Sequence, residues 1–271
     1  MVLQRVYTNQ VNPAPKLTGL SYIPRWVGGI LCYVFFGLGG LLLSLTALPL
    51  LRLWPGKQDV KIARVQKTVQ FTFKFFVSMM QWAGVINVDA KAALLLSNTK
   101  GKVIVANHPT LVDVVILISL IPNAGCIVKR ELWRNPFLRG VVSMAGYIPN
   151  NGADALMYDS KKVLERGNNL VIFPEGTRTK LGESLNPFAR GAANIAIRTE
   201  SDVLAILLNF DVRGLTKQNP WYEIPRQTIN MTVDIGKMFS YQKYDSEHKQ
   251  DAKQVRNLTR DMENYYKKKL K

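Results

Sequence analysis

The sequence has few cysteines, few histidines and few acidic residues. Its two cysteines, Cys32 and Cys126, form neither a disulfide framework nor a metal-ligand pattern, so we expect a reducing compartment, no bound metal and no resident cofactor. Histidine chemistry has two candidates, His108 and His248, and His248 lies in a charged stretch where a solvated side chain is expected. The 19 acidic residues face 36 basic ones, giving a net charge of +17. A chain this basic is expected to bind an anionic partner, either nucleic acid or a membrane surface.

Charged residues make up only 20% of the chain, whereas apolar residues make up 47%. This composition excludes a disordered chain and leaves enough apolar side chains for a sizeable core. A length of 271 residues suits one domain with a small additional element.

One long stretch, residues 26–51, carries no charge at all. About 20 residues suffice for a helix to cross the hydrocarbon core of a bilayer, and the glycines of this stretch are tolerated there. We therefore predict a tail over 1–25 and a transmembrane or re-entrant segment over 26–53, in which Pro49 and the glycines could break the helix. A signal peptide is disfavoured because 25 residues precede the run, and a buried helix of a soluble protein is the remaining alternative.

More Lys and Arg residues follow the apolar run than precede it, which places its C-terminal side in the cytoplasm. Residues 54–86 then predict a basic amphipathic helix, because apolar residues recur every three or four positions. Such a helix can lie among anionic lipid headgroups, or it can pack on the domain core with its charges in water. The sequence favours neither alternative.

Strand and helix patterns alternate over residues 87–245, and a basic helix is predicted over 246–271. Strands are expected at 102–106, 126–128, 170–173, 203–209 and 228–235. Helices are expected at 112–120 and 191–198, and residues 160–166 are expected to close a further helix that ends at Gly167. The alternation predicts an α/β fold with a mostly parallel sheet flanked by helices, preceded by the N-terminal membrane-embedded segment.

The first chemical motif is Asn107-His108-Pro109-Thr110-Leu111-Val112-Asp113, directly after a predicted strand. Pro109 suits the first position of a helix, so we expect His108 in the turn before the helix and Asp113 one turn inside it. In that arrangement the carboxylate can bind one imidazole nitrogen and leave the other free as a base. The alternative is a plain turn with a histidine satisfied by the backbone.

The second motif, Phe173-Pro174-Glu175-Gly176-Thr177-Arg178, also follows a predicted strand. Gly176 permits close approach of a ligand, Arg178 can bind a phosphate with two hydrogen bonds, and Thr177 can donate another. Glu175 is expected to orient Arg178 or to bind a substrate hydroxyl. Ligands of α/β proteins gather beyond the carboxyl ends of strands, so one crevice can hold both motifs. A surface loop with an Arg–Glu pair is the alternative.

Together the two motifs resemble the lysophospholipid acyltransferase superfamily, in particular the 1-acylglycerol-3-phosphate acyltransferases. The resemblance covers residues 95–215 and includes NHxxxxD at 107–113, FPEGTR at 173–178, a KxEL segment from Lys129 and an F-x-x-G step at 188–191. It implies acyl transfer from acyl-CoA or acyl-carrier protein to a lysophospholipid hydroxyl in phospholipid biosynthesis. It also implies that His108 is the general base and that Asp113 orients it. The substrate-binding residues that it implies are Lys129, Glu175, Gly176, Thr177 and Arg178.

Residues 147–152 lack the basic residue that this family often has there, and Ala205 replaces a common proline. These departures leave the acceptor open, and Arg130, Arg134 or Arg139 could supply the missing cation. Nucleic acid is not expected as a partner because no recognition motif is present. A serine hydrolase is disfavoured because no G-x-S-x-G elbow occurs, whereas a hydrolase that uses the same His–Asp pair stays open. We expect a membrane enzyme whose catalytic domain contacts anionic lipid on the cytoplasmic face, in a bacterial inner membrane.

Overall fold

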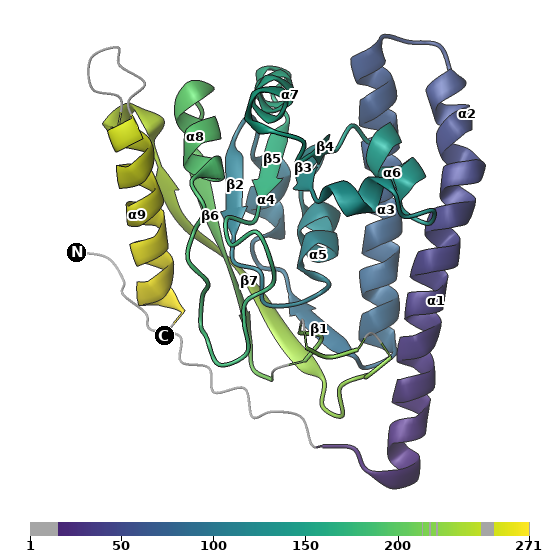
Figure 1. Cartoon of the computed structure of the whole chain (residues 1–271). Coiled ribbons are helices and arrows are strands. Elements are labelled where there is room, and N and C mark those ends of the chain that lie inside the picture. Colours follow the sequence, from purple (N-terminus) through teal and green to yellow (C-terminus); the bar gives the residue numbers. More distant parts are fainter. Residues whose placement is uncertain (1–15, 213, 217, 221, 245–251, 271) are drawn as a thin grey trace.

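A mostly parallel sheet of seven strands forms the centre of the computed structural model (Figure 1). The structure describes residues 16–212, 214–216, 218–220, 222–244 and 252–270, so His248 lies outside the described residues. The strand order is β1-β7-β6-β2-β5-β3-β4, and only β6 and β7 pair in antiparallel fashion. The strands are β1 (Ile86–Asp89), β2 (Val103–Ala106), β3 (Ala124–Val128), β4 (Ile148–Pro149), β5 (Asn169–Ile172), β6 (Val203–Phe210) and β7 (Ile229–Phe239). The predicted α/β class is confirmed.

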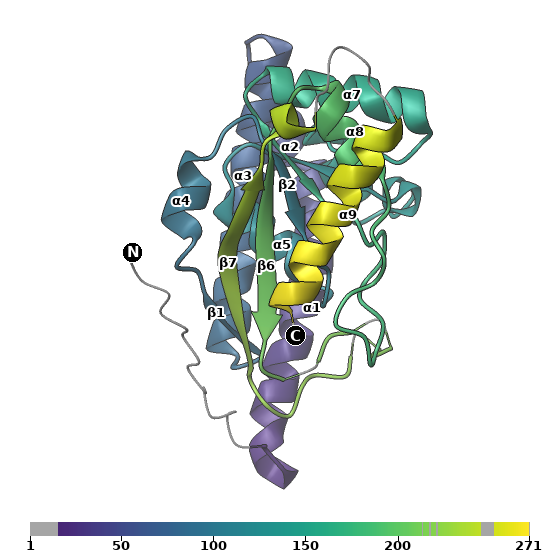
Figure 2. The same cartoon turned by 90° about the vertical axis from the view of Figure 1, so that its left-hand side faces the viewer.

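Helices cover both faces of this sheet (Figures 1 and 2). They are α1 (Ile23–Leu45), α2 (Ala47–Leu53), α3 (Gln58–Trp82), α4 (Ala93–Asn98), α5 (Asp113–Leu120), α6 (Arg139–Met144), α7 (Ala153–Glu165), α8 (Gly191–Arg198) and α9 (Ala252–Lys269). Short 3-10 helices are η1 (Gly19–Tyr22), η2 (Arg130–Trp133) and η3 (Tyr241–Lys243).

Alternate residues of the central strands belong to two separate cores. Ile104 and Ala106 pack with α3, α4 and α5, whereas Val103 and Val105 pack with α7, α8 and α9. This alternation follows from the two-residue period of a strand. Because β2 is parallel to its neighbours β5 and β6, the carboxyl ends of these three strands meet at one edge, and both motifs begin there.

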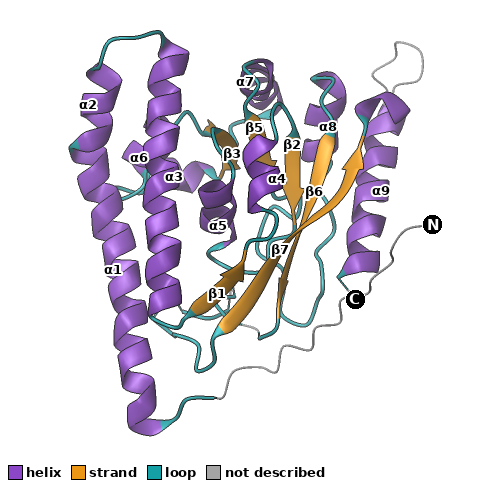
Figure 3. Cartoon of the chain, turned by 180° about the vertical axis from the view of Figure 1, so that it is seen from behind, coloured by secondary structure: helices purple, strands orange, loops and turns teal. Residues whose placement is uncertain are grey.

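The apolar N-terminal stretch forms two helices rather than one. α1 begins at Ile23, before the predicted start at 26, and the helical course breaks at Thr46 (φ −119°, ψ −82°) instead of at Pro49. Together η1, α1 and α2 are long and apolar enough to cross a membrane by length and composition. One side of α1 packs along α3 and α6 (Figure 3). Its other side exposes an apolar face made of Trp26, Val27, Leu31, Val34, Phe35, Leu38, Leu42 and Leu45.

The amphipathic helix α3 packs on the domain core, the second of the two alternatives for this segment. Val65, Val69, Phe76 and Met80 are buried on its inner side. Its outward side carries both charged and apolar residues, because Phe71 is exposed there together with Lys67 and Lys74. We refer to the exposed apolar faces of α1 and α3 as the apolar ridge.

Several short elements went unpredicted: β1, β4, α4, α6 and η2. β4 has two residues and α4 and α6 have six each, which is too short for a periodic apolar pattern. The predicted C-terminal helix is present as α9. It buries Leu258, Met262 and Tyr266 against α8 and the sheet.

Candidate active site

The side chains of His108 and Asp113 meet at the carboxyl end of β2. His108 Nδ1 lies 2.8 Å from an Asp113 carboxylate oxygen, and Asp113 is fully buried. The same carboxylate accepts hydrogen bonds from the backbone N–H of Thr110 at 2.7 Å and from its hydroxyl. The imidazole stacks at 4.4 Å on the ring of Phe173 from the second motif. A carboxylate acceptor at Nδ1 fixes the tautomer in which Nε2 has a lone pair.

The local geometry differs from the prediction, although the pair forms. Asp113 is the first residue of α5 and does not lie one turn inside a helix. Pro109 precedes the helix altogether, within an irregular turn over residues 107–112. This turn folds back so that the two polar groups of Thr110 reach Asp113. Its start is fixed by Asn107, whose side-chain amide exchanges two hydrogen bonds of 2.9 Å with the backbone of Leu208 on β6.

The carboxylate of Glu175 forms its hydrogen bonds within the protein. Its buried carboxylate accepts hydrogen bonds from the backbone N–H of His108 (2.7 Å), the backbone N–H of Asn186 (2.8 Å) and the hydroxyl of Thr179 (2.9 Å). It makes no hydrogen bond to Arg178 within the described residues and does not line the cavity described below. Because these bonds occupy both carboxylate oxygens, Glu175 is a positioning residue that joins the two motifs.

The backbone adds a second link between the motifs, because Thr179 N–H donates to His108 C=O at 2.7 Å. Gly176 lies in the tight turn between them, with a left-handed φ of +66° that favours glycine. Nothing lies within 4 Å of where its Cβ would be, so conformation and not space requires glycine here. Thr177 and Arg178 follow this turn and face the cavity.

Arg178 is held in place by the chain between β6 and β7. Its guanidinium donates to the backbone carbonyl of Thr216 at 2.8 Å. Burial lowers the pKa of Arg178 from its ordinary value, and the nearby charge of Asp113 opposes that shift. Arg178 thus places a positive charge close to the His–Asp pair.

The β6–β7 connection also reaches α1. Near the site, Leu215 C=O accepts from Leu111 N–H at 2.9 Å. At its far end, Arg25 donates to Arg226 C=O at 2.9 Å, and Trp26 donates to Tyr222 C=O at 3.2 Å. These contacts were not predictable, because a connection without periodicity carries no pairing signal.

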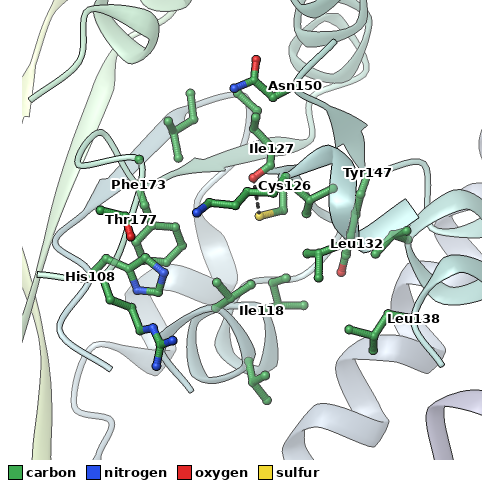
Figure 4. Close-up of a pocket in the computed structure, with 18 of the residues that line it drawn as sticks. His108, Ile118, Cys126, Ile127, Leu132, Leu138, Tyr147, Asn150, Phe173 and Thr177 are labelled. Atoms are coloured by element: carbon green, nitrogen blue, oxygen red, sulfur yellow. Dashed lines mark hydrogen bonds between the residues drawn. The ribbon is translucent and has the colours of Figure 1, made fainter. Parts of the chain in front are cut away.

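A cavity of about 810 Å³ opens beside His108 (Figure 4). His108, Phe173 and Thr177 lie on one side of it, and Leu132, Leu138 and Tyr147 lie on the other. Most of its lining is apolar and comes from several elements: Tyr33 and Phe36 of α1, Phe73 and Phe76 of α3, Val115 and Ile118 of α5, Val141 and Val142 of α6, and Ala192 and Ile195 of α8.

The mostly apolar lining of the cavity also includes a few polar and charged residues, among them the acid Glu131. Lys129, Thr177 and Arg178 line it together with His108. Arg130, Arg134 and Arg139, considered as substitute cations, are not among the described residues that line it. Burial raises the pKa of the Cys126 thiol to about 12, so this group stays neutral at physiological pH. The cavity therefore suits a long apolar ligand with an anionic or polar head.

Comparison with known proteins finds a matching family model and similar sequences. The model of the acyltransferase family matches residues 65–209, just over half of the chain. A 1-acyl-sn-glycerol-3-phosphate acyltransferase from Helicobacter pylori is 36% identical over 117 residues, covering 41% of this chain and 49% of that protein. One of the same description from Cocos nucifera is 30% identical over 119 residues, covering 41% and 38%.

A solved structure shares the fold over nearly the whole chain. The crystal structure of the 1-acyl-sn-glycerophosphate acyltransferase PlsC from Thermotoga maritima superposes with a TM-score of 0.67. The superposition covers 91% of this chain and 96% of the Thermotoga maritima chain. The two sequences are 16% identical, so the likeness concerns the fold alone. The curated relatives named above are matched over half of their length or less.

Proposed function

The chain belongs to the acyltransferase family, and from that premise we propose that it transfers a fatty acyl group from a thioester donor to the free hydroxyl of a lysophospholipid. The proposed acceptor is 1-acylglycerol-3-phosphate, on the strength of the relatives so described. The observation that carries the proposal is the His108–Asp113 pair at the polar end of a long apolar cavity.

In the proposed reaction, Nε2 of His108 removes the proton of the acceptor hydroxyl as its oxygen attacks the thioester carbonyl carbon. The C–O ester bond forms, the C–S bond breaks, and the proton passes from His108 to the departing sulfur, giving an ester and a free thiol. Asp113 orients the imidazole and stabilises its positive charge during the step. General-base assistance of this kind contributes about 10²–10⁴ in rate.

The substrates fit the two ends of the cavity. The apolar interior suits the acyl chain of the donor, because its walls are apolar and its buried thiol is neutral. The acceptor's phosphate is proposed to bind Arg178, with Lys129 as a second cation and Thr177 as a hydroxyl donor. The position of Arg178 near His108 would bring the hydroxyl of a short glycerol backbone to Nε2.

We further propose that the apolar ridge binds one leaflet of a membrane instead of crossing both. α1 packs along α3 and α6, and α3 is fixed to the domain core, so a spanning α1 would draw Lys67 and Lys74 of α3 into the hydrocarbon. Lying in the interface, the same helix inserts its exposed leucines while the nearby lysines meet anionic lipid phosphates. The catalytic domain is proposed to face the cytoplasm.

The test supplies labelled acyl-CoA and acyl-carrier protein to purified protein with lysophosphatidic acid, other lysophospholipids and phosphate-free lipids. We expect labelled phosphatidic acid as the main product and its loss in His108→Ala, with folding checked by circular dichroism. Free fatty acid as the main product would identify a hydrolase. Preference for phosphate-free acceptors would reject the assigned head-group site, and near-normal transfer by His108→Ala would reject the mechanism.

A further inference from the structure

A second, smaller cavity of about 370 Å³ lies beside α8 and the first turn of α9. Its polar lining consists of Arg190, Asn194 and Arg198, and its apolar lining includes Ile197 and Val255. Arg190, Asn194 and Arg198 are spaced by four residues, so one side of α8 presents all three. Neither motif and no step of the proposed reaction uses these residues.

Gly191, the first residue of α8, lines both this cavity and the large one. From that residue onward α8 separates the two, because Ala192 and Ile195 face the large cavity while Asn194 and Arg198 face the small one. A Cβ at Gly191 would meet no atom within 4 Å. The open surface over Gly191 therefore borders both cavities, and we refer to it as the passage.

The positive charge of the small cavity is uncompensated within the part of the chain that the structure describes. Arg190 and Arg198 are exposed, and no ion pair or hydrogen bond of either guanidinium is found there. The acids of α9 have other partners, since Glu263 pairs with Lys267 and Asp261 accepts a hydrogen bond from Tyr244. The first turn of α8 has no acidic residue. A phosphate is the ligand that guanidinium groups bind best in such a place.

The position of the small cavity matches a water-soluble group. α8 and α9 lie on the far side of the sheet from α1 and α3 (Figure 1). A donor whose acyl chain fills the large cavity toward α1 has its thioester at His108 and must extend its remaining part away from the bilayer. In both acyl-CoA and acyl-carrier protein, that part begins as a phosphopantetheine arm.

We propose that Arg190 and Arg198 bind the phosphate of the donor's phosphopantetheine, with the arm passing over Gly191. The inference rests on the proposed function and adds the binding site of the donor's head. It predicts that donor affinity depends on these two arginines, whereas acceptor affinity depends on Arg178.

The experiment measures KM for palmitoyl-CoA, palmitoyl-carrier protein and phosphate-free S-palmitoyl-pantetheine in Arg190→Gln, Arg198→Gln and the double variant. Removing a charge-assisted hydrogen bond is expected to raise KM for phosphorylated donors roughly tenfold in each single variant, with KM for the acceptor unchanged. KM for the phosphate-free donor should stay that of the parent protein. Lys100→Gln, in the turn before β2, is the matched control for loss of one exposed positive charge.

A higher KM for both phosphorylated donors supports a site for the phosphate that the two donors share. A higher KM for only one of them supports the site and identifies that donor, CoA or carrier protein, as the one that occupies it. Unchanged KM for both in the folded double variant, or an equal rise with S-palmitoyl-pantetheine, overturns the inference. Gly191→Leu provides a second test, because a side chain there should obstruct the passage and lower kcat/KM for every donor, including the phosphate-free one.

Binding of unacylated CoA, measured by calorimetry with and without the double substitution, separates this inference from the proposed function. A parent protein that binds CoA through the two arginines but transfers no acyl group supports the site while rejecting the activity. If the parent protein transfers acyl groups and substitution of either arginine has no effect, the proposed activity is supported and the proposed donor site is rejected.

Discussion

The carboxylate of Glu175 accepts a hydrogen bond of 2.7 Å from the backbone N–H of His108, so the second motif positions the first. Glu175 also binds Thr179 and Asn186, and Thr179 N–H returns a hydrogen bond to His108 C=O. The catalytic histidine of the proposed mechanism is thus held by the loop that carries the proposed phosphate-binding arginine. Changes in that loop should alter the reaction itself as well as acceptor binding.

Glu175→Ala should therefore lower both stability and kcat. It leaves three donors without their acceptor, and each unsatisfied buried donor costs about 1–3 kcal/mol. Glu175→Gln keeps one acceptor oxygen and should retain more of both properties. Chemical denaturation and initial rates at saturating substrates measure the two effects. Normal kcat in a folded Glu175→Ala protein would contradict the positioning role.

Asp113→Asn should preserve the fold and slow the reaction. The amide is nearly isosteric but carries no charge, so it cannot stabilise the imidazolium. We expect kcat to fall on the order of 10²–10⁴ while KM for both substrates changes little. Thr110→Ser, which keeps the hydroxyl that binds Asp113, is the control. A kcat close to that of the parent protein would mean that His108 needs no orienting acid.

Leu132→Trp should shorten the acyl chain that the enzyme prefers. Leu132 lies on the side of the cavity opposite His108 and is only partly buried, so a larger ring can extend into the empty space (Figure 4). The added volume corresponds to roughly two methylene groups of a chain. Competition among acyl donors of graded length measures the change, with Leu181→Trp, outside the cavity lining, as control. An unchanged length profile would place the chain elsewhere.

Leu42→Glu should weaken membrane binding without unfolding the domain. Leu42 lies on the apolar ridge with 64% of its surface exposed, so the substitution removes apolar area and adds a negative charge. Binding to vesicles of anionic phospholipid should weaken roughly tenfold or more. Leu94→Glu changes a leucine that is 74% exposed on α4, outside the ridge, and serves as control. Equal losses in flotation assays would show that the ridge has no special role.

The pair of Asp202 and Lys102 should make stability depend on pH in the acid range. Burial raises the pKa of Asp202, but the hydrogen bond from Lys102 at 2.7 Å and the backbone N–H of Tyr241 outweigh it and leave the pKa below its usual value. A carboxyl with a lowered folded-state pKa stabilises the fold above its ordinary pKa of about 3.9, and this contribution is lost as pH falls through the lowered value.

Asp202→Asn should consequently reduce the free energy of unfolding at neutral pH by about 0.5–1 kcal/mol, since the pair is only partly shielded from water. The difference from the parent protein should vanish in strong acid. Urea unfolding over a pH series measures it, and a difference that persists below the lowered pKa would argue against this linkage.

Local pattern in the sequence was enough for the α/β class, the principal strands and the composition of both motifs. A strand such as 103–106 is apolar on both faces, and a motif that follows it lies at the carboxyl edge of a parallel sheet. Chain order therefore indicated that one crevice can hold both motifs, and His108, Thr177 and Arg178 line one cavity. The +17 charge and the uncharged stretch over 26–51 likewise needed no coordinates.

Tertiary packing decided which residues, distant in the sequence, each polar side chain or amphipathic helix contacts. Glu175 differs from a substrate-binding acid because His108, Thr179 and Asn186 surround it. In the same way, α3 is held on the core because α5, which comes later in the chain, covers much of its inner side. Periodicity fixes which residues share a face, but not what that face meets. That choice belongs to the folded chain as a whole, and it also placed Arg190 and Arg198 at the smaller cavity, next to Gly191, which lines the large cavity as well.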